Sequence, residues 1–304
     1  MPPIIQTERL TKSYGVHRGI VEVDLEVREG EVFGFLGPNG AGKTTTIRVL
    51  LDLIRPTSGR ATVFGIGTSA DPVSIHRRIG YLPGEFNLYD RLTGLETIEF
   101  FANLRGGIDR AYSAALVERL GLDPSRRFRE YSKGNKQKVG LVVALQHKPD
   151  LLMLDEPTAG LDPLVQQSFN ELLFEAKRDG RTVFLSSHII SEVERTCDRV
   201  AIIRDGRIVR LDTVDGVRAL AAHEVELRFA APVPAAAFEA IEGVTNVVEE
   251  GRTLRMLVTG PIAQVVRLAG QHELVDFVSR EPSLEEVFLS EYAARRAGTP
   301  AGAA

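Results

Sequence analysis

A glycine-rich segment of the sequence, residues 37–44, has the composition of a phosphate-binding loop. It reads GPNGAGKT, which fits the pattern G-x-x-x-x-G-K-[ST], between an apolar run at residues 32–36 and a helical stretch at 44–53. Glycines let successive backbone N–H groups turn toward phosphate oxygens, while the Lys43 ammonium can reach the β- and γ-phosphates and the Thr44 hydroxyl can ligate Mg²⁺. The residues predicted to hold the phosphates are Gly37, Pro38, Asn39, Gly40, Ala41, Gly42, Lys43, Thr44 and Thr45.

Two acidic residues, Asp155 and Glu156, directly follow the apolar run at residues 151–154. A carboxylate at the end of a buried strand can face a phosphate loop and hold a metal, so Asp155 is predicted to ligate it together with Thr44. Glu156 can orient or deprotonate an attacking water, because phosphoryl transfer depends mainly on positioning. Acids at a strand end are more often a solvated turn, and the phosphate loop upstream favours the metal site. These features indicate a nucleotide hydrolase or a kinase.

A second segment suited to an anion lies between the phosphate loop and the acid pair. Residues 131–138 read YSKGNKQK, and Ser132 and Gly134 precede a helical stretch at residues 139–146. Backbone N–H groups at a helix start favour negative charge, so both residues can face a phosphate. The segment therefore adds a second helix start suited to an anion, beside the phosphate loop.

Further along the chain, residues 157–163 read PTAGLDP, and His188 follows an apolar run at residues 182–185. With the phosphate loop and the acid pair, these segments make the chain resemble the ATP-binding cassette (ABC) ATPases from residue 4 to about residue 218. The resemblance implies an α/β P-loop NTPase fold with a mixed RecA-like core sheet, an antiparallel β subdomain and a helical subdomain at about residues 86–146. It also implies ATP and Mg²⁺ as cofactors.

The resemblance assigns roles to particular residues. Residues 131–137 look like the signature loop, residues 159–162 look like the D-loop, and His188 looks like the switch histidine beside the γ-phosphate. Tyr14 resembles the aromatic residue that stacks on adenine, although an isolated tyrosine after a strand more often packs in a core. The catalytic residues so predicted are Glu156, His188 and Lys43.

The family also implies a head-to-tail dimer, because each ATP site needs a signature segment from a second subunit. Ser132 and Gly134 of one subunit then face the γ-phosphate that Lys43 of the other holds. The partner is a second copy or a paralogue. Asp162 in the D-loop is predicted to border the same nucleotide.

The sequence departs from the family pattern at two places. The signature is usually Leu-Ser-Gly-Gly-Gln, whereas Tyr131, Lys133 and Asn135 stand at its first, third and fifth positions. Gly84 stands where the family usually carries a glutamine that touches the metal shell and couples to the membrane partner. Either Glu85 replaces that contact by a one-residue shift or the contact is missing, and we expect altered coupling with ATPase activity retained.

An apolar cluster follows Gly84 in the sequence and consists of Phe86, Leu88 and Tyr89. Burial within the subunit and exposure as a docking surface are both compatible with it, since exposed apolar clusters mark interaction sites only when they are contiguous. In the family this region lines the groove that receives a coupling helix of a membrane subunit. The sequence leaves these alternatives open.

The elements that must position these motifs alternate between strand and helix, which predicts a parallel sheet. Residues 21–27 alternate apolar and acidic side chains and predict a half-buried antiparallel strand. Helical periodicity between residues 95 and 145 predicts a helical insert. The core strands are expected at residues 32–36, 151–154, 182–185 and 200–203, with helices at 164–178 and 191–196.

The last part of the chain has a different pattern, and we place the domain boundary near residue 218. From residue 224 the order is strand, helix, strand, strand, helix, strand, which is typical of a ferredoxin-like unit. A capping box at residues 283–286 predicts a further helix over residues 284–296, with Leu284, Val287 and Phe288 on its apolar face, before a frayed tail. Residues 219–304 are expected to form an accessory domain, either a dimerisation module that buries these side chains or a regulatory sensor.

Composition narrows the class of protein. The 304 residues are comfortable for two domains, and a net charge of -4 argues against a nucleic acid partner, because that affinity depends on clustered Lys and Arg. The single cysteine, Cys197, is expected to be a packed thiol in a reducing compartment. No secretion signal is recognised, and the longest apolar runs are too short to span a bilayer, so a membrane role is expected to be peripheral.

The function predicted from the sequence is that of the ATPase subunit of a membrane exporter, working with separate polytopic transmembrane subunits at the cytoplasmic face. The form of the signature and a C-terminal extension ending in PSLEEVFL resemble the drug- and antibiotic-efflux branch of prokaryotic cassettes. The alternative is a soluble cassette ATPase acting on ribosomes or nucleic acid. Such proteins carry two cassettes or a long coiled-coil insert, whereas this chain has one phosphate loop.

Overall fold

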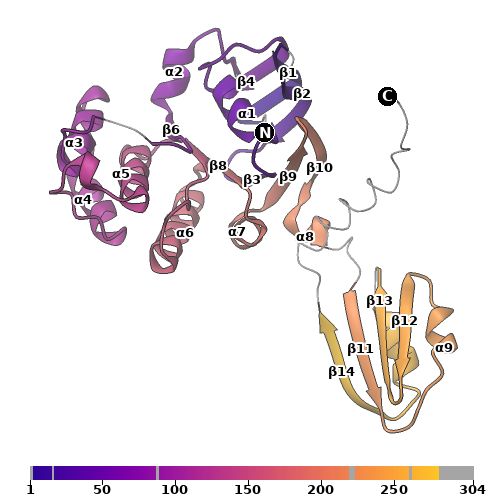
Figure 1. Ribbon diagram of the computed structural model, residues 1–304. Coiled ribbons are helices and arrows are strands. Elements are labelled where there is room, and N and C mark those ends of the chain that lie inside the picture. Colours follow the sequence, from indigo (N-terminus) through magenta and orange to yellow (C-terminus); the bar gives the residue numbers. More distant parts are fainter. Residues whose placement is uncertain (1–2, 16, 87–88, 219–222, 260–261, 281–304) are drawn as a thin grey trace. The chain divides into compact units, whose positions relative to one another are not determined.

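The computed structural model describes residues 3–15, 17–86, 89–218, 223–259 and 262–280. The chain divides into two compact units, Met1–Asp212 and Thr213–Ala304, each with its own hydrophobic core (Figure 1). The boundary predicted near residue 218 differs from this division by the length of α8 (Val214–Arg218), which belongs to the second unit. No helix among the described residues is long and apolar enough to cross a bilayer.

A six-stranded sheet forms the centre of the first unit, in the order β10-β9-β3-β8-β7-β6. Strands β6, β7, β8, β3 and β9 run parallel, and β10 follows β9 after Asp205 and Gly206, which both adopt positive φ, as a tight hairpin requires. The bounds are β3 (Val32–Leu36), β6 (Ile79–Leu82), β7 (Leu151–Asp155), β8 (Thr182–Ser187), β9 (Arg199–Arg204) and β10 (Arg207–Thr213). The parallel core expected from the strand and helix alternation is therefore confirmed.

A four-stranded antiparallel sheet, in the order β2-β1-β4-β5, lies in the same unit. Its strands are β1 (Ile5–Tyr14), β2 (His17–Val27), β4 (Ser58–Val63) and β5 (Ile66–Gly67). The half-buried strand predicted at residues 21–27 is the second half of β2. Buried Ile5, Leu10, Val23 and Val63 belong to one core with Phe33, Phe35 and Phe184 of the parallel sheet.

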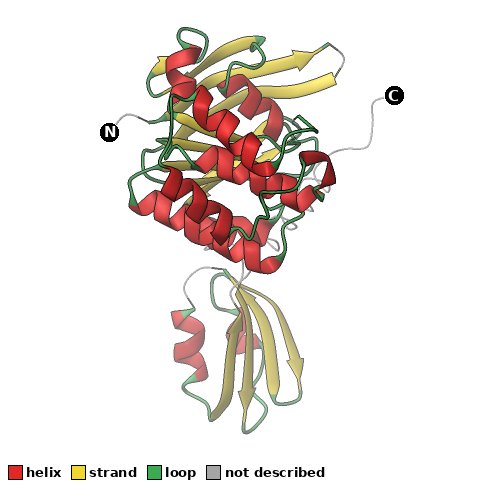
Figure 2. Cartoon of the chain, turned by 90° about the vertical axis from the view of Figure 1, so that its left-hand side faces the viewer, coloured by secondary structure: helices red, strands yellow, loops and turns green. Residues whose placement is uncertain are grey.

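The helices of the first unit gather mainly on one side of its strands (Figure 2). The insert predicted between residues 95 and 145 is helical, and its last helix begins at Lys133 rather than at residue 139 because Ser132 caps it. A capping box formed by Thr93 and Glu96 starts the first insert helix. The bounds are α1 (Lys43–Leu50), α2 (Pro72–Arg77), α3 (Gly94–Leu104), α4 (Arg110–Arg119), the 3₁₀ turn η1 (Phe128–Glu130), α5 (Lys133–Leu145), α6 (Pro163–Arg178) and α7 (Ile190–Thr196).

The second unit consists of a four-stranded antiparallel sheet in the order β12-β13-β11-β14, with two short helices. Alternate residues of β11 and β13 enter its core, including Leu227, Phe229 and Met256. The bounds are β11 (His223–Phe229), α9 (Ala236–Glu239), β12 (Val244–Glu250), β13 (Thr253–Val258), α10 (Ala263–Ala269) and β14 (Leu274–Arg280). The helix predicted at residues 284–296 lies outside the described residues.

Candidate active site

The phosphate loop joins the end of β3 to the start of α1 and wraps around the side chain of Lys43. The ammonium donates hydrogen bonds to the carbonyls of Gly37 (2.6 Å) and Pro38 (3.2 Å), and Lys43 is only 6% exposed. Gly42 adopts a φ of 112°, and a β-carbon there would lie 2.7 Å from Cγ2 of Ile20. The loop therefore requires glycine at this position both for its backbone angle and for its closeness to β2.

Asp155 and Thr44 lie together at the carboxyl end of the parallel strands, as the sequence predicts. The Thr44 hydroxyl donates to Oδ2 of Asp155 at 2.7 Å, and the Ser186 hydroxyl at the end of β8 donates to Oδ1. The Asp155 side chain is buried. A hydroxyl and a carboxylate oxygen are hard ligands of the kind that Mg²⁺ prefers, so this pair of residues fits the metal that the cassette fold implies.

Glu156 lies between two partners with which it makes charged or polar contacts. Its Oε1 is 3.1 Å from the Lys43 ammonium, and its Oε2 is 2.7 Å from Nδ1 of His188. Its backbone φ is 50°, a left-handed conformation that costs a non-glycine residue about 1–2 kcal/mol. The residue is held there by its N–H, which donates to the Ser186 carbonyl at 3.1 Å, and by Gln137, whose Nε2 donates to the Glu156 carbonyl at 3.1 Å.

Two other positions bear on this site. A β-carbon on Gly84 would lie 3.3 Å from Oδ2 of Asp155, so a side chain at this position would reach the carboxylate directly. The Glu85 side chain is exposed.

Tyr14 ends β1 and is 47% exposed, with the Lys12 ammonium 5.4 Å from its ring centre. Core packing is therefore the wrong interpretation for Tyr14, whose ring is about half exposed.

Ser132, Gly134 and Asp162 shape the starts of two helices within the chain. Ser132 caps α5, because its hydroxyl accepts from the Asn135 N–H at 3.3 Å. Asp162 caps α6 by accepting from the Val165 N–H at 3.0 Å. Gly134 packs so closely on the carbonyl of Gly160 that any β-carbon would collide with it. The contacts predicted for these residues across a dimer stay a prediction.

The polar side chains Gln137, Thr158, Ser187 and Glu192 form part of this region and were not predicted from the sequence. Gln137 is 2% exposed and donates to the carbonyls of Glu156 and Pro157, both at 3.1 Å. Thr158 and Ser187 donate to the two carboxylate oxygens of Glu192. Gln137 lies outside the helix predicted at residues 139–146, so its buried position in α5 had no signal in the sequence. Glu192 had none either, because Thr158 lies in a turn and Ser187 ends β8.

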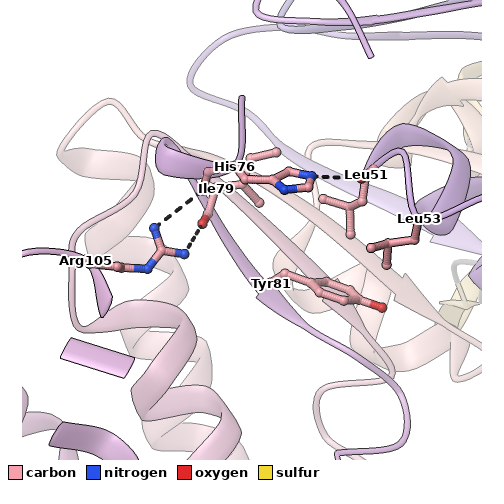
Figure 3. A pocket seen from close by; sticks show the side chains of 6 residues that line it. All are labelled: Leu51, Leu53, His76, Ile79, Tyr81 and Arg105. Carbon is pink, nitrogen blue, oxygen red and sulfur yellow. Dashed lines mark hydrogen bonds between the residues drawn. The ribbon is translucent and has the colours of Figure 1, made fainter. Parts of the chain in front are cut away.

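A cavity of about 200 Å³ lies beside β6 and is lined mainly by apolar side chains (Figure 3). Its lining residues are Leu51, Leu53, His76, Ile79, Tyr81 and Arg105. The Arg105 guanidinium donates to the Ile79 carbonyl at 2.9 Å, and His76 Nε2 bonds to the Leu51 carbonyl at 2.8 Å. Burial, with the charge of nearby Asp155, raises the pKa of Tyr81 to about 12, so its hydroxyl stays neutral.

The apolar cluster after Gly84 is divided between burial and exposure. The Phe86 ring is half-buried and packs edge-on against Phe128, with ring centres 5.9 Å apart. Tyr89 is 63% exposed and packs against Phe100, also with ring centres 5.9 Å apart. Leu88 lies outside the described residues. Burial is therefore the correct interpretation for Phe86, while Tyr89 is open to solvent.

The fold and this arrangement of a phosphate loop, an acid pair and a histidine define a P-loop nucleotide hydrolase of the cassette type. The family described as ABC transporter matches residues 20–159. The bacitracin transport ATP-binding protein BcrA of Bacillus licheniformis is 41% identical over 212 residues, covering 69% of each chain.

Solved structures agree with this class. The structure of an ATP-binding subunit of an ABC transporter is 32% identical, with a TM-score of 0.65, and covers 71% of this chain and 92% of its own. The dimeric post-hydrolysis structure of the ATP-binding cassette MJ0796 bound to ADP and Pi is 26% identical, with a TM-score of 0.64, covering 69% and 98%. The chain belongs to the ABC transporter family and is an ATPase that binds ATP.

Proposed function

We propose that this chain is the ATP-hydrolysing subunit of a membrane exporter whose transmembrane subunits are separate chains, at the cytoplasmic face of the membrane. The observation that carries the ATPase part is the Glu156 carboxylate, which lies 3.1 Å from the Lys43 ammonium and 2.7 Å from His188 Nδ1. The similarity to a bacitracin transport protein supports export of an antibiotic, a drug or a lipid-like compound.

The residues of the site divide the work of phosphoryl transfer. The phosphate-loop N–H groups and Lys43 bind the β- and γ-phosphates, and Tyr14 stacks on the adenine. Thr44 and Asp155 would hold Mg²⁺, which when bound neutralises charge that develops on the phosphate oxygens. Glu156 orients the attacking water and accepts its proton, and His188 fixes the direction of the Glu156 carboxylate through the 2.7 Å contact.

A second subunit completes each ATP site in this proposal. The Ser132 hydroxyl and the N–H groups at the start of α5 contact the γ-phosphate bound to the partner subunit, and Asp162 borders the same interface. The dimeric state of the related MJ0796 cassette, which is bound to ADP and Pi, supports this arrangement. The partner is a second copy or a paralogue.

Two further regions receive roles in the proposal. Tyr89 and Phe100 are exposed and pack against each other, and we assign them to the surface that receives the transmembrane subunit. The second unit has the strand and helix order and the sheet order of a ferredoxin-like fold, and we assign it to dimerisation. Gly84, where the family usually carries a glutamine, brings no side chain to the Asp155 carboxylate, and we assign altered coupling to the membrane subunits to this difference.

The decisive test is the variant Glu156→Gln. We expect steady-state ATP hydrolysis to fall by at least about a thousandfold while ATP binding persists, because the amide cannot accept the water proton but still fills the site. ATP should then trap a dimer, detectable by size-exclusion chromatography with light scattering. Glu118→Gln on the exposed side of α4 is the matched control and should behave as the natural protein does. Near-normal turnover of Glu156→Gln would overturn the assignment.

A further inference from the structure

The side chain of Glu192, in the first turn of α7, connects two loops of the active site. Its Oε1 accepts from the Thr158 hydroxyl at 2.5 Å, and its Oε2 accepts from the Ser187 hydroxyl at 2.8 Å. Thr158 follows Glu156 by two residues, and Ser187 directly precedes His188. One carboxylate therefore links the segment that contains Glu156 to the segment that contains His188 and fixes the spacing between them.

The loop from Glu156 to Thr158 is held on its other side by the signature helix. Gln137 in α5 donates to the carbonyls of Glu156 and Pro157, both at 3.1 Å. The loop is therefore held between α5 and α7 by side chains that reach it from both helices. These hydrogen bonds stabilise the left-handed backbone of Glu156, because a strained residue keeps its conformation only when its surroundings hold it there.

We propose that Glu192 is a positioning residue for ATP hydrolysis, which sets the contact between Glu156 and His188 without touching the nucleotide. The inference rests on the proposed roles of Glu156 and His188. Hydrogen bonds to an ionised group are the stronger ones, and two of them converge here on a single carboxylate. The contacts also give a continuous route from α5, which Ser132 caps and whose first turn contains Gly134, to the histidine of the same chain.

A positioning role predicts a particular kinetic signature. Glu192→Ala should lower kcat roughly ten- to hundredfold, because small displacements of catalytic groups have costs of this size. The KM for ATP should change less than about twofold, since Lys43 and Thr44 make their hydrogen bonds to the phosphate loop and to Asp155 rather than to Glu192. Glu192→Gln should be intermediate, because an amide offers only one acceptor oxygen to the two hydroxyls.

Variants of Thr158, whose hydroxyl donates to Glu192, provide an independent measurement that does not depend on the folding of Glu192 variants. Thr158→Val should lower kcat in the same way, and Thr158→Ser, which keeps the hydroxyl, should restore at least half of it. In the double variant Glu192→Ala with Thr158→Val, kcat should fall no further than in Glu192→Ala alone, because both changes remove the same hydrogen bond. Arg195→Ala, an exposed position of the same helix, serves as the control with unchanged kinetics.

Activity must be normalised to the amount of folded protein that binds ATP. Unchanged kcat in Glu192→Ala, additive losses in the double variant, or equal activity of Thr158→Val and Thr158→Ser would each overturn the proposal. A loss explained entirely by a smaller folded fraction would overturn it as well. These outcomes are separate from failure of the proposed function, which the ATP-trapped dimer of Glu156→Gln tests in a chain with Glu192 intact.

Discussion

The carboxyl edge of the parallel sheet and the open face of the sheet in the second unit both carry opposite charges close together, in different surroundings. At the edge, the side chains of Lys43 and Glu156 are 6% and 19% exposed. On the open face, Arg255 and Glu226 form a contact of similar length, 3.0 Å, yet are 48% and 43% exposed. Water screens the electrostatic attraction within the exposed pair much more than within the buried pair. Burial therefore decides which pair interacts strongly enough to act in catalysis.

The comparison extends to how the charges are held. Glu156 is fixed by hydrogen bonds with Ser186 of β8, Gln137 of α5 and His188, and its backbone is left-handed. Arg255 contacts Glu226 and Glu250 on neighbouring strands, an arrangement that keeps a sheet face soluble and that rearranges at little cost. Dense hydrogen-bond support of a buried charged pair therefore marks the functional site, while evenly paired exposed charges mark a solvated face.

The largest expected effect comes from removing the buried cation. Lys43→Ala should weaken ATP binding by about a hundredfold or more, because it removes a phosphate ligand and leaves Glu156 without its charged neighbour. Isothermal titration with ATP measures this loss. Lys177→Ala is the matched control, since the Lys177 pair with Asp198 is 39% and 36% exposed. Equal losses in both variants would contradict the distinction between buried and exposed pairs.

The next effect concerns the close packing of the signature helix. Gly134→Ala should destabilise the first unit by about 1–3 kcal/mol, because a β-carbon there meets the Gly160 carbonyl and α5 must shift. Urea unfolding followed by circular dichroism measures the change, and steady-state ATPase activity should fall with it. Gly140 is a useful comparison, since a β-carbon there meets the Leu82 side chain rather than backbone. A stable and fully active Gly134→Ala protein would show that the helix start tolerates movement.

A smaller effect depends on pH. Burial, with the charge of Arg105, lowers the pKa of His147 to about 4, below the value near 6.5 of an unfolded histidine. The unfolded chain therefore takes up the proton first, so the free energy of unfolding should fall as pH drops from about 6.5 to 4. Partial exposure of the ring limits the loss to about 1–2 kcal/mol. Unfolding midpoints across this range, compared with those of His147→Asn, should show a flatter profile in the variant.

The smallest effect is expected on the open face of the second unit. Arg255→Ala should leave the free energy of unfolding and ATP binding almost unchanged, because exposed pairs contribute little. Thermal unfolding at low and high salt measures the difference, which should shrink as salt rises. A loss of stability comparable to that of Gly134→Ala would show that this face is covered in the folded protein and that its charged pairs are buried.

Local patterns predicted much of the fold. The phosphate loop, the buried strands and α6 are each specified by neighbouring residues, through glycine spacing, apolar runs and capping. The first strand, β1, is expected before Tyr14 but has no bounds from the sequence, because Arg9 adopts a φ of 47° and register shifts interrupt the alternation of its side chains. The start of α5 was placed too late because Lys133, Asn135 and Lys136 give no apolar periodicity, and only the Ser132 cap defines it.

The residues of the site also divide into those that local motifs predict and those whose role depends on contacts between distant parts of the chain. The sequence by itself predicted the chemistry, since Lys43, Thr44, Asp155 and Glu156 lie in short motifs whose residue types indicate phosphate and metal binding. The tertiary structure alone decided how those motifs are held, through Ser186 on Asp155, Gln137 on the loop at Glu156, and Glu192 between Thr158 and Ser187. The physical reason is distance along the chain. The contacts of Ser186 with Asp155, of Gln137 with Glu156 and of Glu192 with Thr158 join residues 31, 19 and 34 positions apart, and no local pattern encodes a hydrogen bond between them.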